Sequence, residues 1–78
     1  SMEMAQSAAI EGAGVALLPK LIAVPEFEAG RLVAVMPEWS SEPVDITLVC
    51  RPNSLPKPQV AALRRLLMSR CDGAANHD

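Results

Sequence analysis

Aromatic, histidine and cysteine residues are scarce in this sequence, and each shortage excludes a class of site. Only Phe27 and Trp39 are aromatic among 78 residues, so aliphatic side chains and alanine must form the core. The single histidine, His77, lies in a polar terminal stretch without a neighbour that could hold it in a Ser-His-Asp or Cys-His arrangement. We therefore expect no catalytic residues and no enzyme activity.

The two cysteines, Cys50 and Cys71, are too few for a disulfide scaffold. Neither belongs to a CxxC pair, and no histidine stands at a ligand spacing, which disfavours a zinc site. The simpler interpretation is a buried thiol on a strand and a thiol near the end of a helix. The sequence therefore predicts no metal, no cofactor and a cytoplasmic location.

A strong positive charge and a long apolar run are also lacking. Seven lysines and arginines against nine aspartates and glutamates give a formal net charge of −2, so we expect no nucleic-acid surface. Prolines at positions 19, 25, 37 and 43 interrupt the chain well before the ~20 apolar residues of a membrane span. Glu3 and Gln6 stand where the apolar part of a signal peptide would be. We therefore expect that the protein is not exported and does not contact a membrane.

Half of the residues are hydrophobic, and glycine and proline divide them into short segments. Residues 3–11 are rich in helix formers and predict a helix that ends at Gly12. A short helix is predicted over residues 20–23, with a second helical turn over 26–29 that ends at Gly30.

Gly12 and Gly14 also suggest a phosphate-binding loop. However, they follow a helix and precede a strand, the reverse of a dinucleotide fingerprint, so a helix cap and a tight turn are favoured.

Three segments have the pattern of strands. Residues 15–18 and 32–36 are continuous apolar runs, typical of strands covered on both faces as in a parallel sheet. Residues 44–50 alternate with a period of two, which predicts one better buried face. A polar loop over residues 38–43 separates the last two strands.

The last helix is predicted to begin near Pro58, where prolines are tolerated, and to continue to residue 71. Its apolar face is formed by residues at helical spacing: Val60, Leu63, Leu67 and Cys71. Residues 72–78 are predicted to be a disordered tail, and residues 1–2 are a cloning remnant or an initiator. The order α-β-α-β-β-α favours an α/β layer structure.

The folding balance of so short a chain is close to zero. Burial of apolar surface is worth roughly 110 kcal/mol, against about 115 kcal/mol of ordering entropy. Small chains in this position recruit a metal, a disulfide or a second subunit. We therefore expect a homo-oligomer in which copies share strands.

Three blocks of the sequence stand in a fixed order. They are residues 8–19 (AAIEGAGVALLP), residues 28–39, which contain EAGRLV and MPEW, and residues 45–49 (DITLV), which precede Leu55-Pro56 and the last helix. Together they resemble LysR-type transcriptional regulators, whose blocks read AxxAGxGxALLP and aaGrLvxvlPxW. The resemblance runs from about residue 3 to residue 70.

The resemblance implies an α/β fold, as part of an effector domain that is similar to a type II periplasmic binding protein. Residues 3–71 would be the C-terminal portion of that domain, completed by another chain. Segment 3–30 would belong to the second lobe, 31–37 would cross the hinge, and 44–71 would return to the first lobe. DNA contact would come only through a helix-turn-helix that these residues do not include.

The resemblance also places six residues near the effector cleft or hinge, with roles in backbone approach and apolar lining. They are Gly12, Gly14, Pro19, Met36, Pro37 and Trp39. For Trp39 a second interpretation stays open, because the indole could equally cover a hydrophobic edge of the core.

Two functions follow from these observations. The first is a C-terminal piece of the effector-sensing domain of a LysR-type regulator, with a small metabolite as partner. The alternative is a free-standing, truncated module that associates with itself and binds no ligand. A solute-binding protein of a transport system shares the fold but is disfavoured by the absent export signal.

Overall fold

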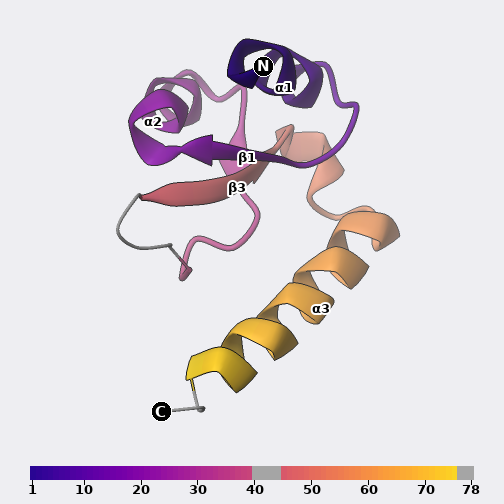
Figure 1. Ribbon diagram of the computed structural model, residues 1–78. Coiled ribbons are helices and arrows are strands. Elements are labelled where there is room, and N and C mark those ends of the chain that lie inside the picture. Colours follow the sequence, from indigo (N-terminus) through magenta and orange to yellow (C-terminus); the bar gives the residue numbers. More distant parts are fainter. Residues whose placement is uncertain (40–44, 76–78) are drawn as a thin grey trace.

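The protein is described by a computed structural model that gives the backbone of residues 1–39 and 45–75 and the side chains of residues 1–39 and 45–70. The predicted order α-β-α-β-β-α is confirmed, with a short 3₁₀ helix before the last element (Figure 1). The elements are α1 (Met2–Ile10), β1 (Ala16–Pro19), α2 (Lys20–Ala29), β2 (Val33–Ala34), β3 (Ile46–Cys50), η1 (Pro52–Ser54) and α3 (Pro58–Ala75).

The three strands form one sheet in the order β1-β3-β2, and both pairings are antiparallel. The expectation of a parallel-type sheet is therefore wrong. Leu18 is completely buried but Leu17 is 58% exposed, so β1 is covered on one face only. A short apolar run shows that a strand is buried but does not show in which direction its neighbour runs.

The sheet also joins segments that the resemblance assigned to two lobes. β1 belongs to segment 3–30 and β3 to segment 44–71, yet Leu17 pairs with Leu48 in the same sheet. Segment 31–37 supplies β2, which pairs with the other side of β3. In the described residues this segment is an edge of the sheet, and its place at a hinge between lobes stays a prediction.

Helix α1 lies against the sheet together with α2 (Figure 1). The Ser1 hydroxyl caps α1 by accepting a hydrogen bond from the backbone N–H of Met4 at 3.3 Å. The helix ends at Ile10, close to the predicted end, and Gly12 follows with a φ of +88°. That left-handed conformation suits glycine and turns the chain toward β1.

Helix α2 is one continuous element, and the expectation of two short helical pieces is wrong. Pro25 lies inside it without ending it. The missing N–H of Pro25 leaves the carbonyl of Leu21 without its helical partner, and both residues lie on the exposed side, where water can reach. The helix ends at Gly30, as predicted, with a φ of +78°.

Two groups of buried residues lie on opposite faces of the sheet. Ala9, Leu18, Ala23, Leu32 and Val49 fill the space between the sheet and the first two helices. On the other face the buried residues are Val35, Met36, Cys50 and Val60, with Trp39 and Leu48 packed against them. Cys50 is a buried strand thiol, as expected, and burial raises its pKa.

β2 is shorter than the predicted strand over 32–36, although the backbone N–H of Val35 still donates to the carbonyl of Leu48 at 2.8 Å. The predicted loop over 38–43 lies largely outside the described residues. Helix α3 extends away from the sheet in Figure 1 and continues to Ala75, into the segment predicted as a tail. None of the helices in the described part of the chain has the length and apolar character needed to cross a bilayer.

On the predicted apolar face of α3, Val60 is buried while Leu63 and Leu67 are half-buried. The side chain of Cys71 lies outside the described residues. The helix therefore packs against the core from Val60 as far as Leu67 and Met68.

Candidate functional site

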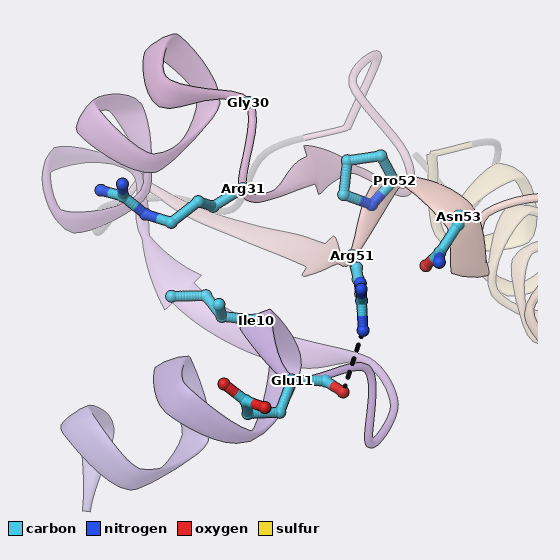
Figure 2. Close-up of a pocket in the computed structure, with 7 residues that line it drawn as sticks. All are labelled: Ile10, Glu11, Gly30, Arg31, Arg51, Pro52 and Asn53. Atoms are coloured by element: carbon cyan, nitrogen blue, oxygen red, sulfur yellow. Dashed lines mark hydrogen bonds between the residues drawn. The ribbon is translucent and has the colours of Figure 1, made fainter.

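An open hollow of about 450 Å³, lined by charged and apolar residues alike, lies where the ends of α1, α2 and β3 meet. Figure 2 shows the residues that line it, which come from three separate parts of the chain: Ile10, Glu11, Gly30, Arg31, Arg51, Pro52 and Asn53. We call this hollow the arginine pocket. Its position depends on the fold, because the three segments are brought together only when β3 pairs inside the sheet.

Arg31, which follows the glycine cap of α2, is bound to a carboxylate. Its Nε and Nη2 donate to the two carboxylate oxygens of Glu26 at 2.6 and 3.2 Å. This hydrogen bonding lowers the pKa of Glu26 below its ordinary value of 4.5 and raises the pKa of Arg31. Glu26 is 8% exposed, so the pair is anchored on one side and its charges largely compensate each other.

Arg51 directly follows Cys50, the last residue of the central strand, so its backbone is held by the sheet. Its Nη1 donates to the carbonyl oxygen of Glu11 at 3.4 Å, a long contact with the end of α1 (Figure 2). Among the described residues it forms no salt bridge. A guanidinium has five N–H donors, so most of those on Arg51 remain available.

Gly12 determines how closely Arg51 can approach the α1–β1 turn. A Cβ at this position would lie 3.3 Å from both Cδ and Nη1 of Arg51. With a φ of +88°, the turn itself also disfavours a side chain. The absence of a side chain at position 12 therefore leaves the space that the arginine occupies.

The other residues predicted for the cleft do not meet in one place. Gly14 lines a shallow hollow beside α1, whereas Pro19 is at the opposite end of β1. Pro37 lines a different hollow of about 380 Å³ next to α3. Met36 and Trp39 do come together, and their role in a cleft stays a prediction.

Met36 and Trp39 share an apolar hollow of about 140 Å³ on the sheet face opposite α1 and α2. The remaining lining comes from Leu17, Leu48 and Leu67. Both interpretations of Trp39 persist here, because the half-buried indole packs against the core and also borders an open apolar surface.

None of the residues that line the arginine pocket was predicted as a site residue; only Gly12, which lies next to it, was. One local signal for a site residue was present, because Arg51 lies directly after a predicted strand and before a proline-containing turn. Its partner residue Glu11 lies 40 positions away, and no local pattern connects them. In the described residues no group of three potential metal ligands is found.

The comparisons with known proteins identify one family. The family model described as the LysR substrate binding domain matches residues 1–72, nearly the whole chain. Searches of curated proteins and of solved structures find no significant match.

Proposed function

Because this chain belongs to the LysR substrate-binding-domain family, we propose that it senses a small effector molecule for a LysR-type transcriptional regulator. The observation that carries the proposal is the family match over residues 1–72. The antiparallel sheet, with α1 and α2 on one face and α3 on the other, is consistent with part of such a domain. Domains of this family belong to regulators and not to enzymes.

Within that role we assign the chain to the C-terminal part of the effector domain, as its motifs suggest. The arginine pocket is the proposed effector site, because it is a hollow that combines apolar surface with a few charged groups and is built from three segments. A ligand that contacts the ends of α1, α2 and β3 together would favour the arrangement in which they lie close. That shift in population is the step by which binding would reach the rest of a cytoplasmic regulator and its DNA-binding part.

Nuclear magnetic resonance tests this role directly. The ¹⁵N-labelled chain is titrated with pools of small metabolites of different charge. We expect at least one pool to move the amide signals of Glu11, Gly30 and Asn53 in a saturable way. If no pool moves them, the proposed effector site is contradicted. In the gene, an in-frame helix-turn-helix upstream of Met2 would support the regulator, whereas a stop codon would contradict it.

The second candidate, a self-association module, is favoured by one specific observation. Leu17 is 58% exposed on β1 and borders the apolar hollow with Trp39 and Leu48. An apolar strand at the edge of a sheet is a common site for pairing with another chain. Light scattering after size-exclusion chromatography tests this: a dimer supports it, and a monomer at micromolar concentration contradicts it.

A further inference from the structure

We infer that the arginine pocket takes a small monocarboxylate, with Arg51 as the group that binds the carboxylate. The inference rests on the proposed function, since it names the chemical class of the effector. Three features support it: the charges that line the pocket, the free donors of Arg51 and the space that Gly12 leaves for the Arg51 side chain.

The charges favour one negative group on the ligand. Glu26 compensates Arg31 through two hydrogen bonds, so Arg31 offers little net attraction. Figure 2 shows the head group of Arg31 directed away from Arg51, and the carboxylate of Glu11 turned away from it as well. Among the described residues Arg51 is therefore the cation of the pocket without a carboxylate partner, and it offers one positive charge to an anionic group.

The donors of Arg51 match a carboxylate in shape. A guanidinium presents parallel N–H groups that bind both oxygens of a carboxylate at once. On Arg51 the Nη1 group makes only the long contact of 3.4 Å to the Glu11 carbonyl, and the bond lies in an exposed region. A carboxylate can therefore bind without breaking a salt bridge.

The backbone of Arg51 is held by the sheet, and its side chain has room beside the α1–β1 turn. Cys50 holds its backbone at the end of the central strand, and the turn at Gly12 admits its side chain. Ile10 and Pro52 add aliphatic surface to the pocket, so the ligand can carry a small apolar body next to its carboxylate.

The test compares acids with their uncharged amides. The ¹⁵N-labelled chain is titrated with acetate, propionate and benzoate, and separately with acetamide, propionamide and benzamide. We expect the acids to move the signals of Glu11, Asn53 and the Arg51 side chain saturably, while the amides leave them in place. Because charged hydrogen bonds are strong, Arg51→Gln should raise the Kd by about tenfold or more.

Two further variants make the result specific. Arg65→Gln removes an exposed arginine that lines a different hollow and should leave binding unchanged. Arg51→Lys keeps the charge but lacks the planar fork, so it should bind more weakly than the unaltered chain and more tightly than Arg51→Gln. A dispersed spectrum without ligand shows that each variant is folded.

The carboxylate assignment is overturned if none of the acids moves these signals, if the amides move them equally, or if Arg51→Gln binds as before. If uncharged or cationic metabolites nevertheless reach the pocket, the effector role stands and only the ligand class fails. If no small molecule of any charge reaches it, both proposals fail.

Discussion

Thr47 is a buried residue whose hydroxyl has no hydrogen-bond partner in the described part of the chain. It lies on the central strand at 1% exposure, on the face that α1 and α2 cover. A buried hydroxyl without a partner carries a desolvation cost, so Thr47→Val should raise the free energy of unfolding by about 1 kcal/mol. Urea denaturation measures the change. Thr47→Ser, which keeps the hydroxyl and loses a methyl group, should destabilise the chain, and a stable serine variant would contradict this account.

Gly12 and Gly30 form a matched pair of helix-end glycines. Their φ values of +88° and +78° are similar, but a Cβ meets Arg51 only at position 12 and open space at position 30. Gly12→Ala and Gly30→Ala should each cost about 1–2 kcal/mol, because alanine disfavours this backbone conformation. Only Gly12→Ala should also move the Arg51 side-chain signal in the NMR spectrum. An equal shift of that signal in both variants would contradict the contact.

Glu26 makes the stability of the chain depend on pH. Arg31 donates hydrogen bonds to its ionised form, so the folded pKa lies below the ordinary value of 4.5. The folded state therefore binds this proton more weakly than the unfolded state, and the stabilisation is present above pH 4.5. It is lost as the pH falls through the folded pKa. Glu26→Gln should have a lower Tm at pH 7 and a smaller loss of Tm on acidification; a parallel loss in both chains would contradict this prediction.

At the scale of elements, α2 contains the clearest local conflict. Pro25 removes the hydrogen bond to the Leu21 carbonyl and its ring crowds that carbonyl. Pro25→Ala restores the hydrogen bond and removes the crowding, which stabilises the folded helix. Alanine also gives the unfolded chain more freedom, which offsets part of this gain, so we expect the free energy of unfolding to rise by about 1–2 kcal/mol. Thermal denaturation followed by circular dichroism measures it. Val24→Ala, at the exposed neighbour, is the control, and an equal gain there would assign the effect to alanine itself.

The ends of the elements were more predictable than their arrangement. Gly12 and Gly30 mark the ends of their helices. Glycine adopts the left-handed conformation readily, so the residue type alone predicts this local feature. Pro25 stands between the two predicted helical pieces, yet the helix continues through it, because tolerance of the lost hydrogen bond depends on which side of the helix faces water. The direction of the strands, and the contact between Arg51 and Glu11, arise only from pairing across the sheet.

At the scale of the whole molecule, the two faces of the sheet are covered unequally. Two helices cover the face that contains Leu18 and Val49. The other face receives α3 from Val60 to Met68, while Leu66 stays 53% exposed and Leu17 58% exposed. β3 is already paired on both sides within the chain, so sharing of strands can involve only the outer edges of β1 and β2.

A second copy that covers Leu17 would stabilise the folded chain by mass action. We therefore expect the Tm, followed through Trp39 fluorescence, to rise when the protein concentration is raised about a hundredfold. Leu17→Thr should remove this dependence, because it takes an apolar side chain from the edge of the apolar hollow. Leu21→Thr is the matched control, since Leu21 is 87% exposed on α2 and does not line that hollow. A Tm that stays constant with concentration in the unaltered chain would contradict self-association, while the effector role of the arginine pocket would be unaffected.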